Sequence, residues 1–138
     1  MSNILDIKNL TKTYHTPKGE ILAIKDISFD IQEGEIIGIV GSSGCGKSTL
    51  LNILSGLDSK TSGKIYMNNL KTAYMLQTDA LLPWLNVLDN ACIGLKLMNI
   101  KNENNILYVK NLLKSFGLES FMYAFPNNLS GGMKQRVG

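Results

Sequence analysis

The sequence has little of what marks several protein classes. Its 138 residues contain only two cysteines, Cys45 and Cys92, too few for a disulfide framework, which favours a reducing compartment. No apolar run approaches the ~20 residues that a membrane-spanning helix needs. The net charge is only +3 and the lysines are scattered, so we expect no nucleic-acid partner. The first residues lack the basic and apolar stretches of a secretory signal, and we expect any membrane role to come through a partner.

The first part of the chain has the patterns of strands around one helix. Residues 4–10 and 21–31 alternate between apolar and polar residues, as half-buried strands do. Residues 35–40 form a continuous apolar run, which is typical of a strand buried on both faces of a parallel sheet. Residues 47–57 carry an apolar stripe at helical spacing. These patterns predict a β-rich part with one amphipathic helix.

Two further strands are predicted at residues 64–67 and 73–76, joined by a turn at Asn68 and Asn69. The character then changes. Pro83 interrupts the chain, and two helical patterns follow at residues 87–100 and 105–116, before a loop at 121–128. Within one domain over 1–138, we therefore expect a β-rich part at 1–78 and a helical part at 79–138.

A glycine-rich motif lies between the apolar run and the amphipathic helix. The spacing Gly-x4-Gly-Lys-Ser is that of the phosphate-binding P-loop. Backbone N–H groups of such a loop, and the positive end of the following helix, attract an anion. We expect the loop to bind ATP through residues Gly41, Ser42, Ser43, Gly44, Cys45, Gly46, Lys47, Ser48 and Thr49.

Two P-loop side chains have specific expected roles. Lys47 offers a mobile charge to the β- and γ-phosphates, and the Ser48 hydroxyl offers a ligand to Mg²⁺. Cys45 is expected to have no chemistry of its own. The alternative is a glycine-rich turn from strand to helix with a surface lysine, but the apolar run before the motif and the helix after it favour the P-loop.

A second motif, Leu-Ser-Gly-Gly-Met-Lys-Gln-Arg, occupies residues 129–136. With both motifs in place, the whole chain resembles the ATP-binding subunits of ABC transporters, and the second motif resembles that family's signature sequence. The resemblance implies an α/β P-loop NTPase fold of the ABC ATPase type. Its parts would be an N-terminal antiparallel β part, a partial P-loop core sheet and a helical subdomain.

The resemblance also assigns roles to two residues outside the motifs. Tyr14 matches the aromatic residue of the family's A-loop, which stacks on adenine, although a tyrosine at a strand end is the alternative. Gln77 matches the glutamine of the Q-loop, which touches Mg²⁺ and the attacking water, although an exposed loop glutamine is the alternative. The resemblance thus implies Lys47 and Gln77 as catalytic residues, with Ser48 and Gln77 at the metal.

The signature sequence is expected to act on a partner. Residues Ser130, Gly131 and Gly132 open a helix, so they offer N–H groups and a helix dipole to an anion. In the family, that anion is the γ-phosphate on the P-loop of a second ATP-binding subunit. The resemblance therefore implies a head-to-tail dimer that closes on two ATP molecules, because ATP binds the closed state better.

Residues 80–90 resemble the corresponding segment of importers for nitrate, sulfonate and taurine. Their apolar patch, Leu81, Leu82, Trp84 and Leu85, is suited to docking on a transmembrane permease subunit. Local core packing is the alternative. The resemblance further implies an indirect link to a substrate-binding protein and a peripheral location on the cytoplasmic side of the cell membrane.

The parts that follow the signature in this family have no counterpart in the sequence. They are the Walker B strand with its Asp and Glu, the D-loop and the switch histidine. We therefore hypothesise an N-terminal part of an ABC ATPase, truncated or split before Walker B, with no appreciable ATPase activity alone. A non-hydrolysing nucleotide-binding fragment stays open, as does a soluble ABC protein of translation or repair. The short segment 69–73 departs from the family's usual loop length.

Overall fold

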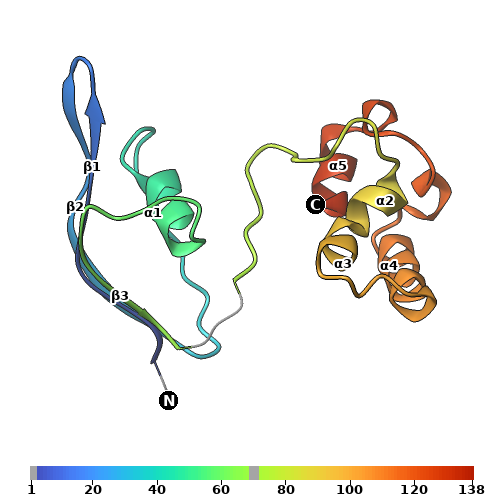
Figure 1. Cartoon of the computed structure of the whole chain (residues 1–138), viewed down its shortest axis with the longest axis horizontal. Helices are drawn as coiled ribbons and strands as arrows, with labels where there is room; N and C mark the ends of the chain where they lie inside the picture. Colours follow the sequence, from blue (N-terminus) through green and yellow to red (C-terminus); the bar gives the residue numbers. More distant parts are fainter. Residues whose placement is uncertain (1–2, 69–71) are drawn as a thin grey trace. The chain divides into compact units, whose positions relative to one another are not determined.

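A computed structural model describes residues 3–68 and 72–138 of the chain. The chain divides into two compact units, Met1–Tyr74 and Met75–Gly138, shown in blue to green and in yellow to red in Figure 1. Each unit has its own hydrophobic core.

The first unit is built on a three-stranded antiparallel sheet. A long hairpin joins β1 (Asn3–Thr16) to β2 (Gly19–Gln32), and β3 (Ser62–Met67) pairs with the other edge of β1, giving the order β2-β1-β3. The strands predicted at 4–10, 21–31 and 64–67 are therefore confirmed, and the first is longer than its alternation indicated. Strand β1 extends to the hairpin turn because its polar second half still pairs with β2, through Tyr14 opposite Ile21 for example.

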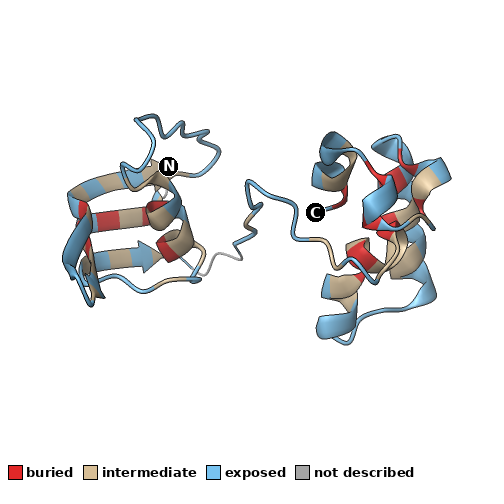
Figure 2. Ribbon diagram, turned by 90° about the horizontal axis from the view of Figure 1, so that it is seen from above, coloured by how far each residue is buried: buried red, intermediate tan, exposed pale blue. Residues whose placement is uncertain are grey.

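Helix α1 (Lys47–Leu54) completes this unit. Its residues Leu50 and Ile53 are buried, and they share one cluster with apolar residues of the sheet. Buried segments are red in Figure 2. The buried sheet residues of that cluster are Leu5, Ile7, Leu10 and Ile24. The amphipathic helix predicted at 47–57 is thus confirmed, except that it ends at Leu54 and Leu57 is exposed. Its apolar stripe attaches the end of the P-loop to the sheet.

Two predicted strands are wrong. Residues 35–40 and 73–76 form no strand, and Ile36 is fully exposed although most of its segment is apolar. A parallel strand obtains its backbone hydrogen bonds only from neighbouring strands and its burial from layers on both faces. No described strand lies beside either segment, because the three sheet strands pair only with one another. The antiparallel sheet is therefore the only sheet in the described residues.

The predicted turn at 68–69 falls partly outside the described residues. Asn68 is described, and its backbone N–H donates to the Ile4 carbonyl at 3.2 Å. Asn69 lies outside the described part, as does most of the short segment 69–73. The turn therefore stays a prediction, as does the comparison of this segment with the family's usual loop.

The second unit is helical. Its elements are α2 (Val87–Ala91), α3 (Ile93–Leu97), α4 (Glu103–Ser115), the 3₁₀ turns η1 (Glu119–Phe121) and η2 (Pro126–Asn128), and α5 (Gly131–Val137). Asparagine side chains cap two of them, since Asn86 accepts from the Asp89 N–H and Asn102 from the Asn105 N–H. Its core consists of Val87, Cys92, Val109, Leu113, Leu118, Met122, Leu129 and Val137.

The single helix predicted at 87–100 is wrong in detail, because the structure has two shorter helices that meet at Cys92. Helical hydrogen bonding continues through the break, from Cys92 N–H to the Leu88 carbonyl and from Lys96 N–H to the Cys92 carbonyl. The break is thus a local distortion of one helical run. The run ends early because Asn99 adopts a left-handed conformation with φ of 56°, which terminates helices. None of the helices in residues 3–68 and 72–138 combines the length and the apolar composition of a membrane-spanning segment.

Candidate functional site

The P-loop is anchored where it enters α1. Gly46 occupies the N-cap position with φ of 96°, a left-handed conformation that favours glycine. A side chain there would also collide with the backbone oxygen of Ala23 on β2. The loop can therefore approach the sheet this closely only with glycine at position 46.

The N-terminus of α1 presents unused hydrogen-bond donors. The first hydrogen bond of this helix runs from the Leu50 N–H to the Gly46 carbonyl at 2.9 Å. No side chain caps the helix. Within residues 3–68 and 72–138, the N–H groups of Gly46, Lys47, Ser48 and Thr49 donate to no protein acceptor. Four such donors at the positive end of a helix form an anion-binding site. This donor set fits the phosphates of a nucleotide.

The Lys47 side chain folds back over the loop. Its ammonium donates to the Gly41 carbonyl at 2.8 Å and to the Ser42 carbonyl at 2.6 Å, and lies 3.6 Å from the sulfur of Cys45. A positive charge is therefore held over the loop that leads into α1. Ser48 is exposed in the first turn of the helix. The loop thus combines a cation, N–H groups without protein acceptors and an accessible hydroxyl.

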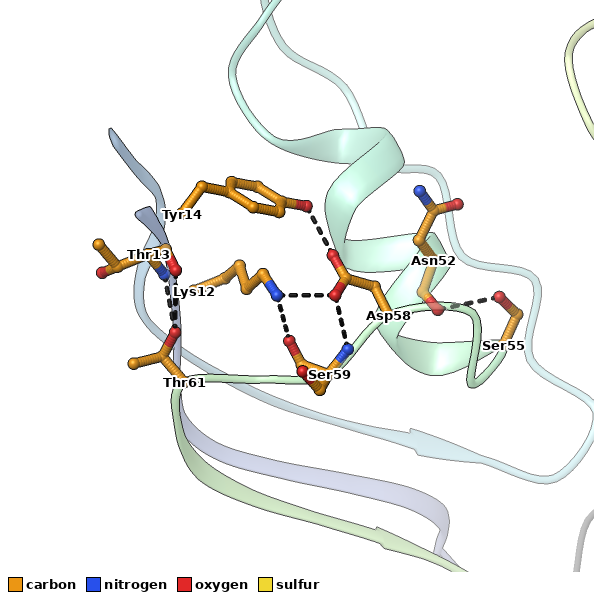
Figure 3. A network of polar contacts seen from close by, with 8 residues as sticks. All are labelled: Lys12, Thr13, Tyr14, Asn52, Ser55, Asp58, Ser59 and Thr61. Carbon is orange, nitrogen blue, oxygen red and sulfur yellow. Dashed lines mark hydrogen bonds and ion pairs between the residues drawn. The ribbon is translucent and has the colours of Figure 1, made fainter. Parts of the chain in front are cut away.

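Tyr14 lies in a network of polar contacts on the same unit (Figure 3). Its hydroxyl donates to one carboxylate oxygen of Asp58 at 2.6 Å, and the Lys12 ammonium lies 4.6 Å from the centre of its ring. The same ammonium donates to the other Asp58 oxygen at 2.7 Å and to the Ser59 carbonyl at 2.6 Å. We call Lys12, Tyr14, Asp58 and Ser59 the tyrosine network.

Sequence reasoning missed Lys12 and Asp58. A lysine in an alternating strand is usually a solvated residue, whereas Lys12 is only 7% exposed. Asp58 stands in a polar turn, where an aspartate needs no tertiary partner. The only signal was that Lys12 lies two residues before Tyr14, which puts both side chains on one face of a strand.

The network lowers the pKa of Asp58 from its ordinary value of 3.8 to about 2, first through the Lys12 hydrogen bond and then through that of Tyr14. A carboxyl group whose pKa is lower in the folded chain is protonated at a higher pH in the unfolded chain. As the pH falls, proton binding therefore favours the unfolded chain. Its contribution to stability is therefore complete above about pH 4 and is lost as the pH falls toward 2.

We predict that Asp58→Asn flattens the acid side of the stability profile. Between pH 4 and pH 2, the free energy of unfolding of the unmodified chain should fall more steeply than that of the variant, because the variant lacks this titrating group. Urea unfolding at several pH values measures the difference, and other carboxyl groups cancel because both chains contain them. Parallel profiles would show that the network does not stabilise the ionised Asp58.

The signature sequence begins α5. The Ser130 hydroxyl caps the helix by accepting from the Met133 N–H at 3.3 Å, while Ser130, Gly131 and Gly132 are exposed. Buried Leu129 and Val137 attach the segment to the core of the second unit. The predicted helix start is confirmed, and its exposed glycines leave backbone accessible.

Gln77 is tied to the signature helix through its backbone. Its carbonyl accepts from the Gln135 side-chain amide at 2.7 Å, and two residues on, Asp79 forms an ion pair with Lys134 at 3.7 Å. The Gln77 side chain itself is exposed. The structure therefore places Gln77 with the signature in the second unit, and Tyr14 with the P-loop in the first.

The predicted apolar patch forms a loop before α2. Leu81 packs against the helical core, whereas Trp84 is 69% exposed. Leu82 and Leu85 are half-buried. Part of the patch thus supports the core, as the alternative interpretation holds, and Trp84 is its most exposed member.

The loop is held by a buried amide. Asn90 is 7% exposed, its side-chain oxygen accepts from the Leu82 N–H at 2.7 Å, and its nitrogen donates to three carbonyls. Those carbonyls belong to Leu82, Leu85 and Asn86, at 3.1, 2.9 and 3.0 Å. One side chain therefore fixes the backbone on both sides of Trp84, a role that the sequence pattern did not reveal.

Comparison with known proteins identifies the family. Residues 24–138 match the family described as ABC transporter. The chain belongs to the ABC transporter family. The resemblance seen in the P-loop and the signature is therefore confirmed.

Relatives in this ABC family include import proteins. The chain is 38% identical over 135 residues to the nitrate import ATP-binding protein NrtD of Synechococcus elongatus, which covers 91% of this chain and 49% of the relative. It is 41% identical over 123 residues to the taurine import ATP-binding protein TauB of Rhizobium johnstonii, covering 84% and 47%. The chain thus spans about half the length of the curated relatives it matches.

A solved ABC cassette has the same fold. It is the dimeric ATP-binding cassette MJ0796, described as a post-hydrolysis state bound to ADP and Pi. The similarity has a TM-score of 0.83 at 35% identity, and covers 96% of this chain and 66% of the cassette. This similarity confirms the predicted fold class.

Proposed function

We propose that this chain is the ATP-binding part of an importer subunit for a small anion or nutrient, of the nitrate, sulfonate or taurine type. The observation that carries the proposal is the donor set at the start of α1. Four N–H groups without protein acceptors lie at the positive end of a helix, beside the Lys47 ammonium. Such a set binds polyphosphate.

Two findings on relatives support the nucleotide and the substrate class. The similar cassette MJ0796 is bound to ADP and Pi, and the similar curated proteins import nitrate or taurine. In this proposal residues 41–49 hold the phosphates of ATP, and Tyr14 stacks on its base. The substrate would be chosen by other subunits.

Hydrolysis would need a metal and further groups. Ser48 is exposed in the first turn of α1 and would offer its hydroxyl to Mg²⁺. We assign the second metal contact, and contact with the attacking water, to Gln77. With Mg²⁺ present, the metal would neutralise charge that develops on the phosphates.

A second copy would complete each nucleotide site. The exposed Ser130, Gly131 and Gly132 would present the first turn of α5 to the γ-phosphate on the partner subunit. The similar cassette MJ0796 is dimeric, which supports this arrangement. Closing around ATP would supply the motion for transport.

The permease contact is assigned to the loop before α2. Trp84 would be its principal contact because it is the most exposed apolar residue there, and the half-buried Leu81, Leu82 and Leu85 would complete the contact. Binding at this loop would hold the subunit on the cytoplasmic side of the membrane, and couple it indirectly to a substrate-binding protein.

The alternative function is nucleotide binding without hydrolysis. The sequence has no apolar strand that ends in an acidic pair, which the family uses to hold Mg²⁺ and activate water. Both functions need the P-loop to bind ATP, so binding is the first property to test.

Hydrogen exchange of backbone N–H groups tests directly whether the P-loop binds ATP. At ATP concentrations 100 times the dissociation constant and with Mg²⁺, exchange of the Lys47, Ser48 and Thr49 N–H groups should slow about 100-fold, because phosphate oxygens then accept from them. The matched control is the Gly131 and Gly132 N–H groups, which also open a helix and should be unaffected in a dilute, monomeric sample. If the P-loop groups exchange at the same rate with and without ATP, the proposed site is wrong.

A further inference from the structure

We propose that Lys12 and Asp58 are positioning residues that hold the ring of Tyr14 in the orientation required to stack on the nucleotide base. This inference rests on the proposed function, in which the P-loop binds ATP and Tyr14 faces its base. It adds two residues to that site and gives each a distinct role.

The two contacts restrain different motions of the ring. The hydrogen bond from the Tyr14 hydroxyl to Asp58 anchors the outer end of the ring, so it fixes mainly where the ring points. The Lys12 ammonium, 4.6 Å from the ring centre, sits over one face and favours one rotation of the ring. Lys12 covers one face, so a base can stack only on the other. Figure 3 shows the ring with both contacts.

The Lys12 ammonium is held in one place, so it can keep the Tyr14 ring in one orientation. Its side chain is nearly buried, and its ammonium has two acceptors, a carboxylate oxygen of Asp58 and the Ser59 carbonyl. A buried ammonium without partners would be costly, so these contacts leave it little freedom to move. Asp58 therefore restrains the ring twice, directly through the hydroxyl and indirectly through Lys12.

Helix α1 connects this network to the phosphate site. The helix begins with Lys47, and the turn after it is closed by hydrogen bonds from the Leu57 and Asp58 N–H groups to the Asn52 carbonyl at 2.9 and 3.1 Å. One short rigid element thus carries the P-loop lysine at its start and the carboxylate that holds Tyr14 just past its end.

The sheet places the same two sites close together. Gly46 of the P-loop lies against Ala23 on β2, and Ile21, two residues along that strand, is paired with Tyr14. Two residues of a strand span about 7 Å, so the positions on β2 that contact the loop and pair with Tyr14 are close together along the strand. Phosphate and base contacts therefore share one framework.

The same sheet contains a matched control. Lys8 pairs with Asp6 at 3.0 Å and lies 5.9 Å from the centre of the Tyr66 ring. This second set has the same three residue types, but Lys8 and Tyr66 are exposed, and the set lies nearer the other end of β1, where Lys8 pairs with Lys64 of β3. Substitution there changes charge and ring contacts in a similar way, away from the P-loop.

The test compares ATP with inorganic tripolyphosphate, which has phosphates and no base. In the full 138-residue chain, Asp58→Ala should weaken ATP binding about tenfold, roughly 1.4 kcal/mol, and change tripolyphosphate binding less than twofold. Tyr14→Phe removes one oxygen and keeps the ring, so it should weaken ATP about threefold and serves if Asp58→Ala does not fold. Asp6→Ala should leave both affinities unchanged. Calorimetric titration measures the affinities.

Each outcome bears on a separate claim. If both variants, Asp58→Ala and Tyr14→Phe, bind ATP like the unmodified chain, the positioning role is wrong. If either weakens ATP and tripolyphosphate equally, the network only stabilises the fold, and the inference is again overturned. If the unmodified chain binds neither ligand, the proposed function itself fails and takes the inference with it.

Discussion

Replacing Lys47 with alanine should weaken ATP binding about 100-fold, which corresponds to roughly 2.7 kcal/mol. The Lys47 ammonium has three donors, and two of them bond to the Gly41 and Ser42 carbonyls. The third N–H donor has only the Cys45 sulfur near it, at 3.6 Å, and sulfur is a weak acceptor. This donor can therefore turn to a phosphate oxygen. A charged hydrogen bond to phosphate of this kind is worth ~1.5–3 kcal/mol.

The loss should extend to tripolyphosphate, because Lys47 acts on the phosphates and not on the base. Lys64→Ala is the matched control, since it removes the same charge from an exposed position on β3, two strands away from the strand that the P-loop contacts. Equal ATP affinities for the two variants would mean that the phosphates bind elsewhere. Any Mg²⁺-dependent ATP turnover that disappears in Lys47→Ala would contradict the non-hydrolysing alternative.

The sequence predicted the parts of the fold that depend on local pattern. The P-loop, the helix that follows it and the start of the signature helix are each specified within about ten residues. Glycine at position 46, the stripe through Leu50 and Ile53, and the Ser130 cap need no distant partner to be recognised. The same holds for β1 and β2, because a hairpin brings its own partner strand.

Prediction from local sequence pattern failed for segments whose structure depends on neighbouring strands. Residues 35–40 have the composition of a central strand, yet Ile36 and Val40 are exposed because no described strand pairs with them. The break at Cys92 likewise lies inside a continuous apolar pattern. Composition indicates what a segment can become, whereas backbone pairing depends on neighbours that the segment itself does not contain.

The candidate site shows the same division. The P-loop residues were found from their spacing, but the partners of Tyr14 were not. Lys12 is buried only because the turn after α1 brings the Asp58 carboxylate to it, 46 residues away in the sequence. Long-range contacts of this kind leave no periodic signal, so only the folded chain reveals them.

Replacing Asn90 with alanine should destabilise the second unit by about 2–3 kcal/mol. The substitution removes the acceptor of the Leu82 N–H and the donor to three carbonyls, at a site that is 7% exposed. Partly buried backbone groups that lose their partners carry a desolvation cost unless water can replace the lost bonds. The loop around Trp84 should therefore loosen before the helices separate.

Trp84 is the only tryptophan in the chain, so its fluorescence reports on this loop. Denaturant unfolding followed by that signal should show the loss for Asn90→Ala, with a change in Trp84 emission already in the absence of denaturant. Asn105→Ala is the matched control, since the Asn105 side-chain nitrogen makes a single bond, to the Ile100 carbonyl at 2.7 Å. That variant should be destabilised by only about 0.5–1 kcal/mol.

If the two variants are destabilised equally, the four contacts of Asn90 have no special role, and the loop is held by Leu81 in the core instead. If Asn90→Ala behaves as expected, Asn90 holds the loop that presents Trp84, which bears on the proposed permease contact. The exposed Trp84 is the residue we assign to the permease, and a docking residue must be presented in one orientation to bind without a further ordering cost. In that proposal, Asn90 would set the orientation in which Trp84 is presented, although its own side chain is buried and hydrogen-bonds only to backbone groups.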